Sequence, residues 1–263
     1  MMSADPARLM RFVLEMRQAG VTDARALSAL ERTARPHFAP DHLEGLALDD
    51  VGLPLAHAQT MTKPSVVGRV ISALAPQDGD VVLEVGAGSG FQAAALSALA
   101  HKVVTLDRWS DLVADARGRF GTARLMRTYA HVADGFEGWP EDAPYDRIVV
   151  NAAMEDVPAP LLAQLKPGGV LGVVEHRAPA GRPLEEQIES GYMTEAYVIE
   201  QAENAGFELE ANASINANPA DDTEHPAGVW TLPPTLRLGE ENRDRYLRIG
   251  ESDRMTLRFR KPE

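Results

Sequence analysis

The spacing of apolar positions predicts helices over the first third of the chain. Residues 6–20 carry apolar side chains at helical spacing with arginines between them. Asp23 can cap a second helix over 24–33, and a third, largely apolar helix is expected at 65–74. The first two segments predict a helical lead-in, residues 1–50, ahead of the main fold.

Apolar strands alternate with helices in the middle of the chain. A Val/Leu run at 81–85 leads into a helical pattern at 91–100, and a second strand at 102–106 follows. Strands that alternate with helices in this way predict βαβ units and a mostly parallel sheet. The sequence therefore predicts an α/β, doubly wound fold that binds its ligand at the carboxyl ends of the strands.

The turn after the first of these strands carries the candidate chemistry. Gly86, Gly88 and Gly90 alternate with small residues, and Glu84 stands in front of them. Glycine permits positive φ and a close approach of ligand to backbone, and the following helix offers unpaired N–H groups. A dinucleotide loop has another glycine spacing, and a carboxylate here would repel a pyrophosphate and suits a cationic ligand. NAD binding and a turn without a ligand remain the alternatives.

S-adenosylmethionine is a cationic ligand, and the pattern E-x-G-x-G-x-G resembles the first motif of class I methyltransferases. Asp107, which ends the next strand, stands where an acid would accept the ribose hydroxyls. This resemblance implies S-adenosyl-L-methionine as cofactor and a Rossmann-like class I methyltransferase sheet.

A loop ahead of the helix at 65–74 narrows the resemblance from the class I methyltransferases as a whole to one family among them. Leu53-Pro54-Leu55 and Gln59-Thr60-Met61-Thr62-Lys63-Pro64 are similar to the Leu-Pro-Ile and Gln-Thr-Ile-Ser-Gln-Pro signature of protein-L-isoaspartate O-methyltransferases. Further segments resemble that family between about residues 8 and 175, namely 35–40, 90–94, 133–139, 144–153 and 165–171.

The family resemblance implies a set of site residues. The family's active-site serine is replaced by Thr62, the next glutamine by Lys63, and a fourth-strand threonine by Asn151; these three are the catalytic candidates. Thr62 can also be read as a turn residue that caps the next helix, and Lys63 as a solvated surface lysine. The expected cofactor-binding residues are Thr60, Met61, Glu84, Gly86, Ala87, Gly88, Gly90, Asp107, Arg108, Asp134, Gly135 and Asn151.

The implied reaction is methyl transfer to a carboxylate, with an L-isoaspartyl residue of a damaged protein as acceptor and protein repair as the purpose. A carboxylate is already nucleophilic at neutral pH, so alignment and exclusion of water would provide most of the catalysis. One alternative is a class I methyltransferase with a different acceptor, such as a small molecule. Another is a cofactor-binding interaction module without catalysis.

The resemblance to this family stops after residue 175, and the remainder looks like a group of poorly characterised bacterial methyltransferases. A helix capped by Thr194 is expected up to residue 205, with strands at 207–215 and 255–259. These strands predict an antiparallel hairpin at the sheet edge. The expected organisation is a single methyltransferase domain, 1–263, with a cofactor-binding core at 51–177 and a sheet-edge region at 178–263.

An insertion at residues 216–250 interrupts the last two strands. Its Asp221, Asp222 and His225 include two metal-ligand types, but adjacent carboxylates are expected to point to different sides, so no metal is predicted. Trp230 and Tyr246 could cover the substrate opening as a lid or pack this connection onto the core.

Two histidines lie where a general base could stand. His57 and His176 are both expected near strand carboxyl ends, and His101 and His131 are assigned structural roles.

Composition and charge exclude some kinds of chemistry and argue against some kinds of partner. The chain has 263 residues, a formal net charge of −13 and no cysteine, which excludes disulfides and thiolate chemistry and argues against a nucleic-acid partner. No apolar run reaches the length of a membrane span, and the first residues lack a secretory pattern, so a cytoplasmic location is expected. The sequence makes no prediction of oligomeric state.

Overall fold

A computed structural model describes residues 6–152 and 159–263. Ala153, the last residue of the 144–153 segment, lies outside the described residues. The main sheet has eight strands in the order β5-β4-β3-β6-β7-β10-β9, with β8 paired to β7. The strands are β3 (Val81–Val85), β4 (Lys102–Asp107), β5 (Thr128–Val132), β6 (Tyr145–Val150), β7 (Leu165–Ala178), β8 (Met193–Thr194), β9 (Glu208–Ala213) and β10 (Arg254–Arg260).

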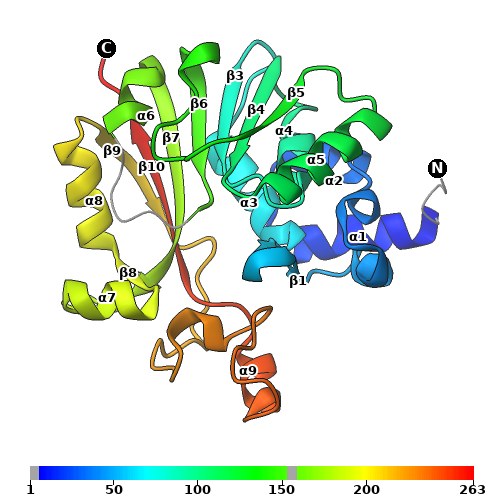
Figure 1. Cartoon of the computed structure of the whole chain (residues 1–263), viewed down its shortest axis with the longest axis vertical. Coiled ribbons are helices and arrows are strands. Elements are labelled where there is room, and N and C mark those ends of the chain that lie inside the picture. Colours follow the sequence, from blue (N-terminus) through cyan, green and yellow to red (C-terminus); the bar gives the residue numbers. More distant parts are fainter. Residues whose placement is uncertain (1–5, 153–158) are drawn as a thin grey trace.

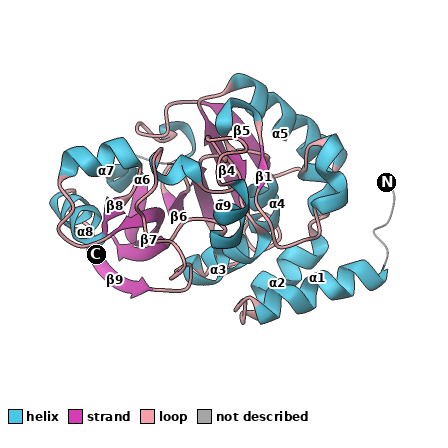
Figure 2. Cartoon of the chain, turned by 90° about the horizontal axis from the view of Figure 1, so that it is seen from below, coloured by secondary structure: helices cyan, strands magenta, loops and turns pink. Residues whose placement is uncertain are grey.

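Helices cover both faces of this sheet (Figures 1 and 2). The α-helices of the described residues are α1 (Pro6–Gln18), α2 (Ala24–Arg32), α3 (Pro64–Leu74), α4 (Phe91–Leu96), α5 (Ser110–Thr122), α6 (Ala159–Gln164), α7 (Leu184–Ser190), α8 (Glu195–Asn204) and α9 (Arg243–Ile249), of which α9 belongs to the insertion ahead of β10.

Alternation along the buried strands gives each face its own core. Val82 of β3 packs with the helices of the first half of the chain, α1 to α5. Leu83, its neighbour, packs on the opposite face with α6 and α8. Both residues are completely buried, as expected for central parallel strands that are covered on both faces. The predicted doubly wound α/β sheet is confirmed.

Local signals placed several helix boundaries. The Asp23 side chain accepts hydrogen bonds from the backbone N–H groups of Arg25 and Ala26 at the start of α2. Thr194 caps α8 by accepting from the Tyr197 N–H. Both side chains satisfy N–H groups that have no partner within the helix.

Three expectations need correction. The helix predicted to reach residue 100 ends at Leu96, and the chain continues in turns. The 165–171 segment, expected as a turn that leads into the fifth strand, is already part of that strand, β7, whose pairing with β6 shifts register between Tyr145 and Arg147. Helix α7 and strand β8 lie in a stretch for which the sequence predicted no element. Both elements are short, seven and two residues, so they contain too few positions to show a periodic apolar pattern.

The last strands form the expected antiparallel edge. β10 runs antiparallel to both β7 and β9, with Thr256 opposite Ala213. The insertion before β10 lies below the carboxyl ends of the parallel strands in Figure 1, and α9 lies across them in Figure 2. The tertiary fold thus brings the last quarter of the chain to the edge where the ligand was expected.

None of the described helices is long and apolar enough to cross a membrane.

Candidate active site

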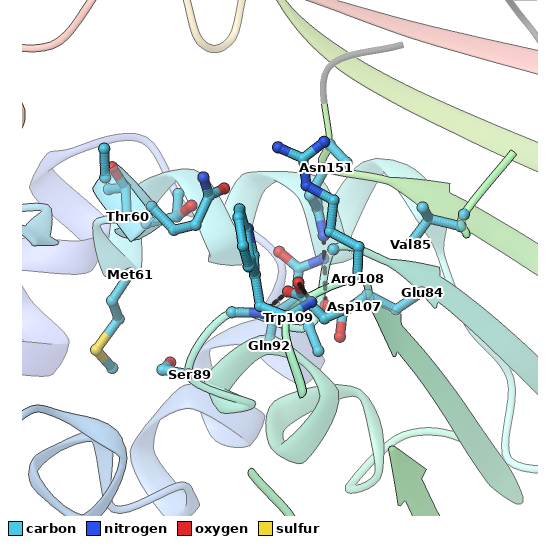
Figure 3. Close-up of a pocket in the computed structure, with 18 of the residues that line it drawn as sticks. Thr60, Met61, Glu84, Val85, Ser89, Gln92, Asp107, Arg108, Trp109 and Asn151 are labelled. Atoms are coloured by element: carbon cyan, nitrogen blue, oxygen red, sulfur yellow. Dashed lines mark hydrogen bonds between the residues drawn. The ribbon is translucent and has the colours of Figure 1, made fainter. Parts of the chain in front are cut away.

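A cavity of about 840 Å³ opens at the carboxyl ends of the parallel strands (Figure 3). It is bordered by the glycine-rich turn after β3, the end of β4, the turn after β5 and the end of β6. Of the predicted site residues it includes all except Lys63 and Gly90, namely Thr60, Met61, Thr62, Glu84, Gly86, Ala87, Gly88, Asp107, Arg108, Asp134, Gly135 and Asn151.

The glycine turn uses conformations that other residues rarely adopt. Gly86 has φ +98°, and an added Cβ would lie 3.3 Å from the backbone nitrogen of Ala152. Gly90 has φ +84°, and its Cβ would lie 2.9 Å from the Phe120 ring. Gly90 therefore does not line the cavity, but its lack of a side chain lets the turn pack against Phe120. The turn keeps its backbone against the sheet while Phe120 and Ala116 of α5 pack closely against Gly90.

Glu84 is a buried acid at the base of the cavity. Its Oε2 accepts a 2.6 Å hydrogen bond from the Thr105 hydroxyl, and its Oε1 accepts one of 3.3 Å from the Asn151 amide. Burial raises the pKa of Glu84 to about 8; the Asp107 charge adds to the rise and the Thr105 hydrogen bond opposes it. A cation in the cavity would favour the ionised carboxylate.

Asp107 joins the ends of two loops. Its Oδ2 accepts from the backbone N–H of Gly88 at 2.9 Å, and its Oδ1 accepts from that of Trp109 at 3.1 Å. The carboxylate is thereby fixed at the carboxyl end of β4, on the cavity wall. This is the position at which an acid binds ribose hydroxyls in doubly wound folds.

The signature loop folds back on itself as a small sheet of β1 (Leu53–Pro54) and β2 (Thr60–Met61). Buried Arg35 anchors this loop, since its guanidinium donates to the carbonyls of Ala47 at 2.7 Å, Val51 at 2.9 Å and Thr62 at 3.2 Å. Burial lowers the pKa of Arg35 to about 10. Arg35 belongs to the 35–40 segment that resembles the family, but the sequence alone did not predict that it anchors this loop.

Thr62 and Lys63 diverge at the start of α3. Thr62 lines the cavity, whereas the Lys63 side chain does not. Lys63 is the N-cap residue of α3 without a side-chain cap, so the reading of Thr62 as the helix cap is wrong. The catalytic roles of both residues stay predictions.

Trp109 and Gln92 are two of the wall residues that were not among the predicted site residues. Trp109 lines the cavity and stacks on His57 at 3.8 Å between ring centroids. Gln92 lines it as well, and its Nε2 is buried with no hydrogen-bond partner among the described residues. Gln92 could have been found from its place in the first turn after the glycines. Trp109 gave no signal beyond its closeness to Asp107.

Of the four histidines considered above, only His176 lies on the cavity wall. His57 Nε2 is hydrogen-bonded to Asp111 Oδ2 at 2.7 Å, and His57 is not on the cavity wall. His131 stacks on Trp139 at 4.1 Å, and His101 contacts Arg127. His176 lines the cavity.

The insertion closes one side of the cavity. Trp230, Pro233, Pro234 and Thr235 line it, together with Val229 and with Ser252 and Arg254 beside β10. Trp230 therefore lies at the opening, in accordance with the lid alternative. Tyr246 is buried and packs edge-on against His225, in accordance with the packing alternative.

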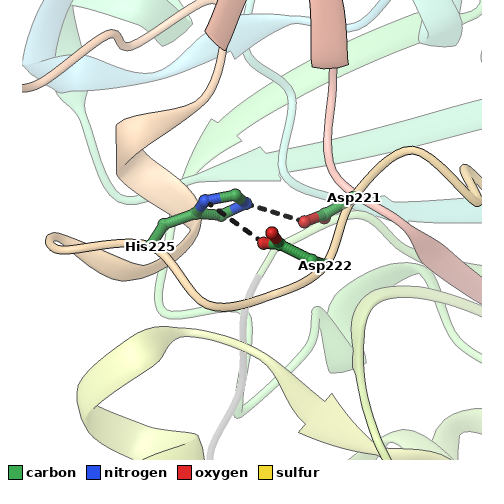
Figure 4. Close-up of side chains that lie close together, drawn as sticks. All are labelled: Asp221, Asp222 and His225. Carbon is green, nitrogen blue, oxygen red and sulfur yellow. Dashed lines mark hydrogen bonds and ion pairs between the residues drawn. The ribbon is translucent and has the colours of Figure 1, made fainter. Parts of the chain in front are cut away.

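Asp221, Asp222 and His225 come together, contrary to the expectation that the two carboxylates diverge (Figure 4). One potential ligand atom of each lies within 4.8 Å of the others. Asp221 already accepts hydrogen bonds from His225 Nε2, from the Tyr192 hydroxyl and from the Asp253 N–H. The cluster therefore has a structural role in holding the insertion, and the expected absence of a metal stays a prediction.

The cavity fits a cofactor with a cationic end and a ribose. It offers a buried acid, an acid at a strand end and a glycine turn, with the Gln92 amide close to the buried acid. This fold and this site define a class I methyltransferase, the class that takes its methyl group from S-adenosylmethionine.

Comparison with known proteins specifies the family. The family model of protein-L-isoaspartate(D-aspartate) O-methyltransferase (PCMT) matches residues 8–187. The chain belongs to this family. It is 51% identical over 186 residues to a protein-L-isoaspartate O-methyltransferase of Paracoccus denitrificans, covering 70% of this chain and 86% of that protein.

Solved structures support the fold. A protein-L-isoaspartate O-methyltransferase superimposes with a TM-score of 0.57 and 24% identity, covering 63% of this chain and 54% of that one, so the chain spans about half of that longer protein. A geranyl diphosphate C-methyltransferase from Streptomyces coelicolor A3(2), solved with S-adenosyl-L-homocysteine, superimposes with a TM-score of 0.56 and 13% sequence identity. The superposition covers 75% of this chain and 78% of that one.

Proposed function

We propose that the protein binds S-adenosylmethionine in this cavity and methylates the side-chain carboxylate of L-isoaspartyl residues in damaged proteins. The observation that carries the proposal is the signature loop. Arg35 and the β1–β2 pairing hold Thr62 on the cavity wall opposite the glycine turn. The family supports the acceptor class, and Thr62 on the cavity wall is the residue of this loop that we expect to contact the acceptor.

The residues of this chain take distinct parts in the reaction. Glu84 balances the positive end of the cofactor from behind the wall, and Asp107 accepts from its ribose. Thr62 donates a hydrogen bond that orients the acceptor carboxylate, and Asn151 lines the same opening while its amide bonds to Glu84. The bound cofactor supplies a methyl group on a positively charged sulfur.

Transfer needs no base from the protein. A carboxylate oxygen forms the new C–O bond as the carbon–sulfur bond breaks, and the electron pair of that bond stays on sulfur as a neutral thioether. No proton moves, so the protein contributes alignment of the two reactants and exclusion of water. The methyl ester can then collapse to a succinimide, which opens again to a normal aspartyl residue in part of the molecules.

The test is transfer of labelled methyl to two peptides that differ only in an L-isoaspartyl or L-aspartyl linkage. We expect label in the isoaspartyl peptide alone. Thr62→Ala should lower kcat/KM about tenfold, the value of one hydrogen bond to a charged group. Thr122→Ala on α5, whose hydroxyl bonds the Gly118 carbonyl away from the cavity, is the matched control and should be unchanged. No label in either peptide, with cofactor still bound, would contradict the proposal.

A second candidate is a different acceptor, such as a small molecule. It is favoured by the side of the cavity formed by residues 229–235, 252 and 254, which lie outside the family match. Label in a small carboxylic acid but in neither peptide would support it. A cytoplasmic location stays a prediction from composition.

A further inference from the structure

One side of the cavity is lined largely by residues that the family match does not cover. They come from the insertion, at Val229, Trp230, Pro233, Pro234 and Thr235, and from Ser252 and Arg254 at the start of β10. The family match ends at residue 187, and His176 is the histidine that the matched part contributes to the cavity wall.

His176 stands at the same sheet edge as Asn151. Val150, which precedes Asn151, pairs with Val173 of β7, and His176 lies three residues further along that strand, opposite Arg254 of β10. Because β6 and β7 are parallel, both side chains are presented at their carboxyl ends, where the cofactor's reacting end is expected. His176 is therefore placed on the acceptor side of the opening.

Contacts on two sides hold the imidazole. Its Nδ1 lies 2.5 Å from the Ser252 hydroxyl oxygen, and the Tyr192 ring meets it edge-on with centroids 6.2 Å apart. Tyr192 is completely buried, and its hydroxyl donates to Asp221 Oδ2 at 2.9 Å. Asp221 also accepts from the Asp253 N–H. The cluster in the insertion thus supports the ring that faces the cavity.

The hydrogen bond to Ser252 leaves Nε2 available to the cavity. In the tautomer with the ring proton on Nε2, the Ser252 hydroxyl donates its hydrogen bond to Nδ1. Nε2 itself has no hydrogen bond to any described residue. Burial and, to a smaller extent, the Arg254 charge lower the pKa of His176 to about 3, so the ring is neutral at physiological pH.

We propose that the Nε2–H of His176 binds one oxygen of the acceptor's reacting carboxylate, with Ser252 as the residue that positions the imidazole. The inference rests on the proposed function and adds to it the group that receives the acceptor. A neutral donor orients the carboxylate without neutralising its charge, which must remain available for attack on the methyl carbon. The nearby cation, Arg254, is paired with Glu251 at 2.8 Å and does not take this part.

The experiment measures the KM for the isoaspartyl peptide and the Kd for S-adenosylhomocysteine in matched variants. His176→Leu should raise KM about 10- to 100-fold, the range expected for loss of a hydrogen bond to a charged group, and leave Kd within twofold. His176→Gln, which keeps an N–H donor near the position of Nε2, should recover part of the loss. Ser252→Ala should raise KM by a smaller factor with kcat nearly unchanged.

His101→Leu is the matched control, because His101 is exposed at the start of β4, at the opposite end of the sheet. It should change neither constant. A KM for His176→Leu within twofold of wild type, with the wild type active on the peptide, would overturn the inference alone. A wild type that labels neither peptide would overturn the proposed function and this inference with it.

A measurement on the unmodified protein keeps the inference testable if the variants fail to fold. In nitrogen-detected NMR of the wild type with S-adenosylhomocysteine, titration with the isoaspartyl peptide should move the Nε2 proton of His176 downfield. An unchanged Nε2 signal at saturating peptide would refute the hydrogen bond.

Discussion

Replacing Glu84 by Gln tests the electrostatics at the base of the site. The folded protein holds the pKa of this carboxyl at about 8, against 4.5 for an ordinary glutamate, because the group is completely buried and Asp107 is near. The folded state therefore binds the proton more tightly than the unfolded chain does. Its contribution to stability is fully present below pH 4.5, declines as pH rises, and is lost above pH 8.

The magnitude follows from the shift. At 1.36 kcal/mol per pH unit, the free energy of unfolding of the ligand-free protein should fall by about 3 to 5 kcal/mol across this window on account of Glu84. Glutamine cannot ionise, so the variant should lack that decline. We expect Glu84→Gln to be more stable than the wild type at pH 8.5 and nearly equal to it at pH 4.5.

Urea unfolding of both proteins at several pH values measures this difference. Parallel stability curves for the two proteins between pH 4.5 and 8.5 would refute the reasoning. The same shift predicts that cofactor binding at pH 7 releases about one proton, since a cation favours the ionised carboxylate. Calorimetry in two buffers of different ionisation enthalpy detects this release, and Glu84→Gln should abolish it while weakening binding.

Two further predictions concern residues that shape the wall. Arg35→Met should lower the free energy of unfolding by about 3 to 5 kcal/mol, because it leaves the buried carbonyls of the signature loop without donors, and a loss under 1 kcal/mol in urea unfolding would contradict this. Asp107→Asn should weaken S-adenosylhomocysteine binding about 10- to 100-fold by calorimetry, because its amide cannot accept from both backbone and ribose; an affinity within twofold of wild type would argue against ribose binding.

Much of the site followed from local signals in the sequence. The alternation of strands and helices, the glycine spacing after β3 and the acids at Glu84 and Asp107 each reflect a constraint within a few residues of chain. Backbone conformation at Gly86 needs a residue without Cβ, and Asp23 and Thr194 cap the helices that follow them. Such signals depend on covalent neighbours, so a single sequence displays them.

The side of the cavity next to the insertion had no such signal. His176 and Ser252 are 76 positions apart, and only the pairing of β7 with β10 brings their side chains within 2.5 Å. The side chains of Asp221 and Asp222 converge with His225 because the turn between them folds back, which alternation along an extended chain did not predict. The sequence does not distinguish a polar loop residue that faces solvent from one that faces a cavity.

The sequence by itself determined the class of fold, the family and the cofactor end of the site, because these depend on short motifs whose backbone geometry is local. The tertiary structure decided which histidine faces the cavity, what anchors the signature loop and how the insertion closes one side of the cavity. These features depend on long-range strand pairing and on burial, and both arise only when segments far apart in the chain pack together.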